Sequence, residues 1–126
     1  MQYLLDTVTV VRHFTGGGRL GKKVNDILDF NENIFLISVI SLMEILYLSE
    51  KQRIDIDLNE TLNKIELSSL YRIVDLTPEI LKVANDLIFY ELHDRLILST
   101  AKWLDIPIIS SDEEFKQVKD IQVLWD

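Results

Sequence analysis

Tyr3-Leu4-Leu5-Asp6 and Ile106-Pro107-Ile108-Ile109-Ser110-Ser111-Asp112 are two apolar segments that each run into an acid. Short apolar runs bounded in this way predict strands that are buried on both faces, as in a parallel sheet. Open parallel sheets bind their ligands at the carboxyl ends of their strands. Asp6 and Asp112 are therefore predicted to stand at a ligand-binding edge of the sheet.

Outward from these two segments, strand-like and helix-like stretches alternate along the whole chain. Such alternation predicts an α/β fold with a mostly parallel central sheet. There is no linker, internal repeat or low-complexity tract, so residues 1–126 are expected to form a single domain. The predicted strands are Tyr3–Leu5, Ile34–Ser38, Tyr71–Asp75, Ile106–Ile109 and Ile121–Leu124.

The predicted helices are marked by apolar residues at helical spacing. Thr77-Pro78-Glu79 predicts a helix start, because it combines a capping hydroxyl, a proline in the first turn and an early acid. The buried face of that helix is expected to comprise Ile80, Leu81, Ala84, Leu87 and Ile88. Two further stripes are Leu20, Val24, Ile27 and Leu28, and Leu58, Leu62 and Ile65.

Composition limits the class of protein. The content of 48% hydrophobic and 27% charged residues is typical of a globular domain, and the absence of cysteine excludes disulfides and thiolate metal sites. The first residues lack a basic start, so no signal peptide is expected. The longest uncharged apolar run, Ile34–Met43, is about half of what crosses a bilayer. A cytoplasmic location without a membrane partner is expected.

The net charge of −8 comes from 13 basic and 21 acidic residues, and by itself it argues against a nucleic-acid-binding surface. The distribution is uneven, however. Residues 7–25 contain Arg12, Arg19, Lys22 and Lys23 and no acid, whereas residues 105–126 contain six acids. The asymmetry is consistent either with an ordinary solvated surface or with a basic strip beside an acidic pocket.

Asp6 and Glu44 each have a structural and a functional interpretation. Asp6 is suited to cap a helix, but it also follows a strand. Ser41-Leu42-Met43-Glu44 fits a capping box, in which the glutamate reaches back to the cap residue. Glu44 also lies one turn beyond an apolar strand, where an acid lining a site would point inward.

Asp94 and Asp112 have the same two interpretations. Asp94 shares a helical face with Ile97, Leu98 and Ala101, which directs it inward, although a first-turn acid also complements the helix dipole. Ser111 and Glu114 fit another capping box, and Glu113 is a weak additional candidate. If the fold gathers Asp6, Glu44, Asp94 and Asp112, their repulsion calls for a hard divalent cation, which takes oxygen ligands.

In combination, four segments resemble the PIN-domain ribonucleases, in particular toxins of the VapC type from toxin–antitoxin pairs. The resemblance covers nearly the whole chain. Val8 departs from the family, which often has a small polar residue there, and Ser111 replaces a commonly basic residue. The matching segments are Tyr3–Thr7, Ser38–Ile45, His93–Ala101 and Ile106–Asp112 with Phe115.

The resemblance implies a three-layer α/β/α sandwich around a short parallel sheet, with a helix beginning near Thr7. The residues alone favour a different structure there, because Thr7-Val8-Thr9-Val10-Val11 has strand propensity and would extend the first strand to about His13.

The resemblance also implies a site and a reaction. Asp6, Asp94, Asp112 and Glu44 would bind Mg²⁺ or Mn²⁺, with Thr7 and Ser110 as hydroxyl groups that support the carboxylates. The implied activity is that of an endoribonuclease whose products carry a 5′-phosphate and a 3′-hydroxyl.

Partners are implied in the same way: an RNA substrate such as a tRNA, a cognate antitoxin protein and a second copy of this chain in a homodimer. Weaker candidates for RNA contacts are Arg12, Lys22, Lys23 and Arg95, although Arg95 fits equally well in a surface ion pair. His13 and His93 have no metal-ligand spacing. His93 is expected to stabilise the turn before its helix.

The sequence also allows three other classes of protein to be considered. The first is a PIN-fold RNA- or protein-binding module without catalytic activity. The second is a phosphoacceptor receiver domain, which needs a lysine after a late strand, where this chain has Ser110-Ser111-Asp112. The third is a haloacid-dehalogenase-like phosphatase, which would show Asp-x-Asp, where this chain has Asp6-Thr7-Val8.

Overall fold

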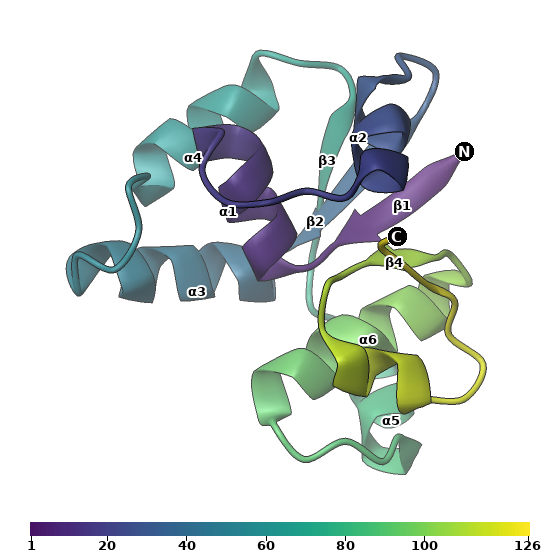
Figure 1. Cartoon of the computed structure of the whole chain (residues 1–126). Helices are drawn as coiled ribbons and strands as arrows, with labels where there is room; N and C mark the ends of the chain where they lie inside the picture. Colours follow the sequence, from purple (N-terminus) through teal and green to yellow (C-terminus); the bar gives the residue numbers. More distant parts are fainter.

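A computed structural model describes all residues, 1–126, and its centre is a five-stranded sheet (Figure 1). Every strand pair in the sheet is parallel. The α/β fold with a parallel central sheet predicted from the sequence is confirmed. The strands are β1 (Gln2–Leu5), β2 (Ile34–Ser38), β3 (Tyr71–Val74), β4 (Ile108–Ile109) and β5 (Val123–Leu124).

The order of the strands in the sheet is β3-β2-β1-β4-β5. The chain therefore builds outward from β1 to β3, then crosses back and continues from β4 on the other side of β1. The reversal lies between β1 and β4, which pair directly through Leu4 with Ile108 and Leu5 with Ile109. In an open parallel sheet, the place where the strand order reverses leaves a crevice at the carboxyl ends of the strands.

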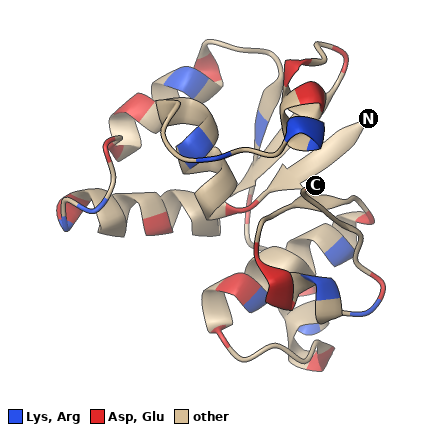
Figure 2. Ribbon diagram, in the orientation of Figure 1, with Lys and Arg blue, Asp and Glu red and all other residues tan.

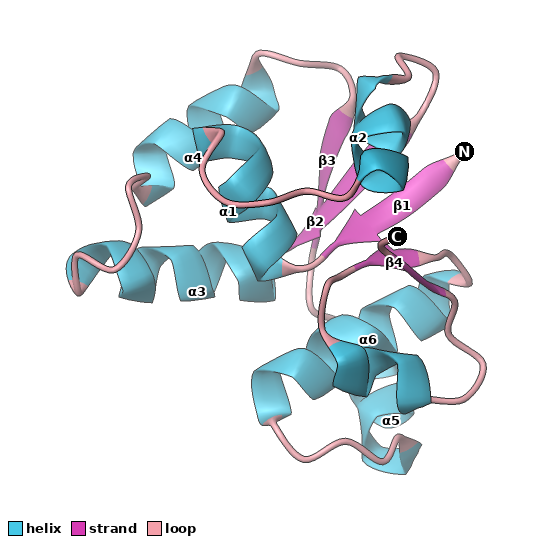
Figure 3. Ribbon diagram, in the orientation of Figure 1, coloured by secondary structure: helices cyan, strands magenta, loops and turns pink.

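Helices cover both faces of the sheet and complete three layers (Figure 3). Successive residues of β1 serve opposite faces, as the alternation of a strand requires. Leu5 packs in a core with residues of α1 to α4, whereas Leu4 packs in a second core with residues of α5, α6 and η1. The helices are α1 (Thr7–Thr15), α2 (Lys22–Asp29), α3 (Val39–Glu50), α4 (Leu58–Glu66), α5 (Pro78–Asp86), α6 (Leu92–Leu104) and the 3₁₀ helix η1 (Glu113–Gln117).

Two predictions from local sequence were wrong. Residues 7–15 form α1 instead of extending β1, because the side chain of Asp6 caps a helix there and Val10 packs into the core. The helix that follows Thr77 ends at Asp86, and two of the apolar residues assigned to its buried face are exposed. Leu81 is 48% exposed and Ile88, beyond the helix, is 95% exposed.

None of the helices combines the length and the apolar character that a bilayer crossing requires.

Candidate active site

Asp6 stands at the junction of β1 and α1, and it is 6% exposed. Its Oδ1 accepts a hydrogen bond of 2.9 Å from the backbone N–H of Thr9, so the capping role is real. Burial raises the pKa of this carboxyl; hydrogen bonds from Ser110 and Thr9 act in the opposite direction, and the charge of Asp112 adds to the rise. Asp6 is thus a buried acid close to another acid.

Glu44 lies in α3, which follows β2 directly. The helix is capped by the side chain of Ser38, and therefore the capping box predicted for Ser41 and Glu44 is wrong. Instead, Oε1 of Glu44 accepts a hydrogen bond of 2.6 Å from the hydroxyl of Thr7. Burial raises the pKa of Glu44, and the nearby charges of Glu91 and Asp6 raise it further.

Asp94 lies in the first turn of α6 and is half-buried. Burial is the largest cause that raises the pKa of its carboxyl to about 7, and the charge of Glu91 is the next. The charges of the three other acids named above, Glu44, Asp112 and Asp6, also contribute. Asp94 is therefore the acid whose pKa is raised by the charges of all three others.

Asp112 follows β4 and caps η1. Its Oδ1 accepts a hydrogen bond of 2.9 Å from the backbone N–H of Glu114. Its own backbone N–H donates to the hydroxyl of Ser110, at 3.1 Å. The predicted capping box of Ser111 with Glu114 is wrong, because Asp112 itself is the cap. Ser110 thus contacts the backbone of Asp112 and influences the carboxylate of Asp6.

The four acids come from four different elements, and the charges of Asp6, Glu44 and Asp112 all raise the pKa of Asp94. No lysine or arginine forms an ion pair with any of them. Figure 2 shows acidic segments where β1 passes into α1 and on the helices nearby. The three other acids thus lie near enough to Asp94 for their charges to raise its pKa, although no group of three of them is drawn together.

The donors suit a hard divalent cation, since every one is a carboxylate oxygen and no basic side chain neutralises the group. No group of three or more acidic, histidine or cysteine side chains is close enough in this arrangement to hold a metal ion. The residues therefore fit such an ion in chemistry and in charge. They would have to draw together to coordinate it.

Two residues near this group were not assigned to it from the sequence. Glu91 caps α6 through a hydrogen bond of 2.7 Å from the N–H of Asp94, and its charge raises the pKa of both Asp94 and Glu44. His93 lies 3.3 Å from Glu91 and lowers the pKa of Glu44. The sequence signal that could have found Glu91 is its place three residues before Asp94, as a helix cap.

The basic candidates do not join the acids. Lys22 and Lys23 line a cavity of about 780 Å³ together with Met1, Tyr3 and Asp126. Arg12 lies in the last turn of α1 and donates a hydrogen bond of 2.9 Å to the carbonyl of Arg19. This basic strip, made of Arg12, Arg19, Lys22 and Lys23, forms no ion pair with any of the four acids.

Arg95 makes no ion pair, so the alternative of a surface ion pair is wrong. Its Nε is buried without a hydrogen-bond partner. The residue follows Asp94 directly, on the helix that carries it.

Residues 3–121 match the PIN domain family, and this chain belongs to that family. A comparison with curated proteins finds no match.

Solved structures give the same fold. VapBC2 from Rickettsia felis, bound to a DNA fragment from its promoter, is similar to this chain at 21% identity and a TM-score of 0.76, with 100% of both chains covered. DNA-bound VapBC from Salmonella typhimurium is 18% identical at a TM-score of 0.73, covering 98% of this chain and 97% of that one.

A third similar structure is VapC20 from Mycobacterium tuberculosis, described as a toxin that cleaves the sarcin-ricin loop. It is 13% identical, with a TM-score of 0.64, and the match covers 95% of this chain and 98% of that one. At identities this low, the similarity to these structures shows a shared fold and nothing more.

Proposed function

We propose that this protein is a metal-dependent endoribonuclease that hydrolyses RNA phosphodiester bonds and serves as the toxin of a toxin–antitoxin pair. The observation that carries the proposal is the group of Asp6, Glu44, Asp94 and Asp112, whose members repel one another without a neutralising basic side chain. A buried anionic group of this kind is costly unless a cation joins it. Family membership and the toxins among the similar structures support the same activity.

The ion in this proposal is Mg²⁺ or Mn²⁺, with Asp6, Asp94 and Asp112 as its principal ligands. When bound, such an ion polarises a phosphate oxygen and makes water a stronger nucleophile. The chain's own contribution is to hold the carboxylates on separate elements, from which they would draw together around the ion. Capping bonds from backbone N–H groups fix one oxygen of Asp6 and one of Asp112.

Glu44 has a distinct role in the proposal. It either joins the ligands or orients the attacking water as a general base. The hydroxyl of Thr7 holds Oε1 of Glu44 at 2.6 Å, and this hydrogen bond favours the charged carboxylate against the effect of burial. Thr7 is thus a positioning residue for Glu44, and it acts from the first turn of the helix that Asp6 caps.

The RNA backbone is proposed to contact the basic strip and Arg95. The strip supplies exposed cations on a protein of strongly negative net charge, and phosphate contacts by Lys and Arg supply most of the sequence-independent affinity for RNA. Arg12 follows Asp6 by six residues along α1, a rise of about 9 Å, which is short enough for a few nucleotides to span. The unpartnered Nε of Arg95, the residue that follows Asp94 in α6, is a further donor.

A cognate antitoxin and a second copy of the chain are the proposed protein partners, because several of the similar structures are toxin–antitoxin complexes. The surface that suits such partners is the outer side of α3, beside Glu44. Three large apolar residues are exposed there: Met43, Leu46 and Tyr47. Sedimentation of wild type against Leu46→Lys tests the homodimer, which the variant should dissociate. A monomeric wild type would contradict it.

The activity is tested with purified protein and a panel of structured RNAs that includes tRNAs and sarcin-ricin loop RNA. We expect cleavage with Mg²⁺ or Mn²⁺ and none with EDTA. Asp6→Asn and Asp94→Asn should each reduce the rate by roughly 10²- to 10³-fold while the fold is retained. Asp105→Asn is the matched control, because Asp105 caps the other end of α6 in a left-handed conformation that asparagine tolerates.

Cleavage at the wild-type rate in EDTA would rule out the proposed mechanism. Thermal stabilisation by the ion without cleavage of any RNA would favour a binding module without catalytic activity.

A further inference from the structure

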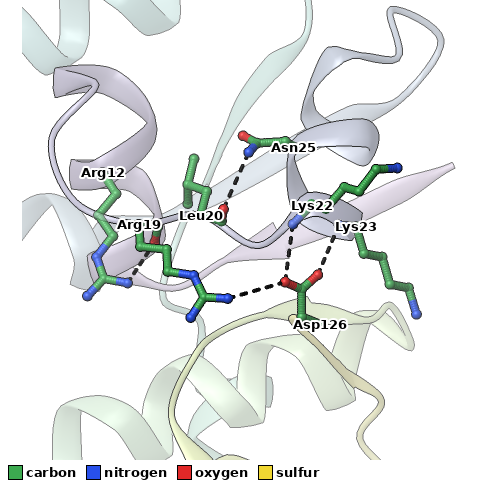
Figure 4. Close-up of polar contacts among 7 residues, drawn as sticks. All are labelled: Arg12, Arg19, Leu20, Lys22, Lys23, Asn25 and Asp126. Carbon is green, nitrogen blue, oxygen red and sulfur yellow. Dashed lines mark hydrogen bonds and ion pairs between the residues drawn. The ribbon is translucent and has the colours of Figure 1, made fainter.

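The carboxylate of Asp126 lies in the middle of the basic strip (Figure 4). Its Oδ2 accepts a hydrogen bond of 3.2 Å from the backbone N–H of Lys22, and its Oδ1 accepts one of 3.0 Å from that of Lys23. The guanidinium of Arg19 lies 3.9 Å from Oδ2. The side chain thus bridges more than a hundred residues of sequence to place an anion among the cations of residues 19–23.

The backbone around this carboxylate is shaped to admit it. A Cβ at Gly21 would lie 2.3 Å from Oδ2 of Asp126, so only glycine leaves room for the carboxylate to accept from the two amides, one with each oxygen. The helix α2 begins at this point, and its own cap residue, Gly21, has no side chain to accept these bonds. Asp126 therefore performs from a distance the capping that the local sequence lacks.

A second contact holds the same segment of the chain. Trp125 lies beneath the guanidinium of Arg12, which is 5.9 Å from the ring centroid. The side chain of Arg12 also packs against Gly18, where a Cβ would come within 2.9 Å of it. Residues 125 and 126 therefore contact two of the four cations of the strip, Arg12 and Arg19, and the backbone at the other two.

We propose that Asp126 is an autoinhibitory residue, which occupies the position that an RNA phosphate takes when the substrate binds. The inference rests on the proposed function and extends it, since it names the contact that an RNA backbone must displace. A carboxylate and a phosphodiester each present two oxygens and one negative charge to the N–H groups and the guanidinium. The substrate and Asp126 cannot both accept these bonds.

The exchange is feasible because the contact is weak. The side chains of Arg19 and Lys22 are 82% and 91% exposed, and that of Asp126 is 32% exposed, so water and salt screen the ion pair. RNA brings several phosphates at once and releases its counterions on binding. Asp126 therefore excludes single anions more effectively than a polyanion, which makes the strip selective for a chain of phosphates.

The test measures binding of a short fluorescent single-stranded RNA in EDTA by anisotropy over a range of salt concentrations. Asp126→Asn keeps an oxygen for one amide but removes the charge. We expect it to bind RNA roughly threefold to tenfold more tightly than wild type at low salt. Its salt dependence should steepen by up to about 0.7 in log–log slope, the value for one additional phosphate contact on a single strand.

The matched control is Asp120→Asn, which changes the net charge equally at an exposed residue with positive φ, where asparagine is tolerated. Its RNA affinity should stay close to that of wild type. Adding Arg19→Gln to Asp126→Asn should remove the gain. In a wild-type RNA titration followed by NMR, the amide signals of Lys22 and Lys23 should shift as phosphate replaces the carboxylate.

Equal RNA affinity of wild type and Asp126→Asn would overturn the autoinhibitory role and leave the proposed function standing if both cleave RNA. Amide signals of Lys22 and Lys23 that do not move while RNA binds would overturn it as well. If no variant binds RNA in EDTA, Asp126 is not a competitor of RNA, and the cleavage assay decides separately on the proposed function.

Discussion

The acidic group and the basic strip differ in whether their charges are neutralised within the protein. Asp6, Glu44, Asp94 and Asp112 repel one another, and the pKa is raised at the first three. The basic strip holds a carboxylate of its own, that of Asp126, on two backbone amides and Arg19. The acidic group thus lacks a counterion, and the basic strip carries one.

The contrast indicates which ligand each group of charges receives. A group that leaves like charges unneutralised is where a cation gains most by binding. A group of cations that already holds an anion binds a further anion only by exchange.

The largest expected effect is that an ion bound by the acidic group stabilises the folded protein. With Mg²⁺ at 100 times its Kd, the free energy of unfolding should rise by about 2.7 kcal/mol. For a domain of this size the corresponding rise in Tm is roughly 10 °C. Calorimetry with and without EDTA measures it. An equal rise in a double variant, Asp6→Asn with Asp94→Asn, would show that the ion binds elsewhere.

A tenfold effect on cleavage is expected from Thr7→Val. The substitution keeps the shape of the side chain but removes the hydroxyl that holds Glu44, so the carboxylate loses its orientation. We expect kcat to fall about tenfold with little change in KM. Thr15→Val is the matched control, because the Thr15 hydroxyl bonds only within its own turn and neighbouring loop. Unchanged kcat in Thr7→Val would contradict the positioning role.

The pH dependence of stability should show the repulsion directly. The pKa of Asp94 is raised from 3.8 to about 7 in the folded protein, so the folded state binds the proton more tightly than the unfolded state does. Without a divalent ion, the contribution of Asp94 to stability should therefore increase as the pH falls from 7 toward 4. Denaturant titrations of wild type and Asp94→Asn isolate it as a difference. The same pH slope in both proteins would contradict the assignment.

The smallest expected effect is at the basic strip, where Asp126 binds. Asp126→Ala removes a helix cap, and the free energy of unfolding should fall by about 1 kcal/mol. Asp120→Ala is the corresponding control. A loss much larger than a cap accounts for would mean that Asp126 is too firmly bound for RNA to displace.

The sequence was most informative where a strand runs into an acid. Asp6 and Asp112 could be placed at one edge because strand alternation and parallel topology are local and regular. The helix after Asp6 could not be derived from residues 7–11, whose β-branched side chains favour a strand. Burial of Val10 and the cap of Asp6 outweighed that propensity, and only the family resemblance indicated the helix.

The contacts missed from the sequence are those between distant residues. The local pattern around Glu44 predicted a bond to Ser41, whereas its partner is Thr7, on another helix. The approach of Asp126 to residues 21–23 joins opposite ends of the chain, and no periodicity or capping pattern specifies it. Glycine at position 21 was the one available sign, because a close contact of the backbone commonly requires glycine.

In the proposed site, Asp6, Asp94 and Asp112, which come from three separate elements, bind a divalent ion. Crystals grown with Mn²⁺ and measured for anomalous scattering locate that ion directly. We expect a peak bounded by oxygens of Asp6, Asp94 and Asp112. A fully ordered site without a peak at saturating Mn²⁺, or a peak held by other residues, would contradict the proposal.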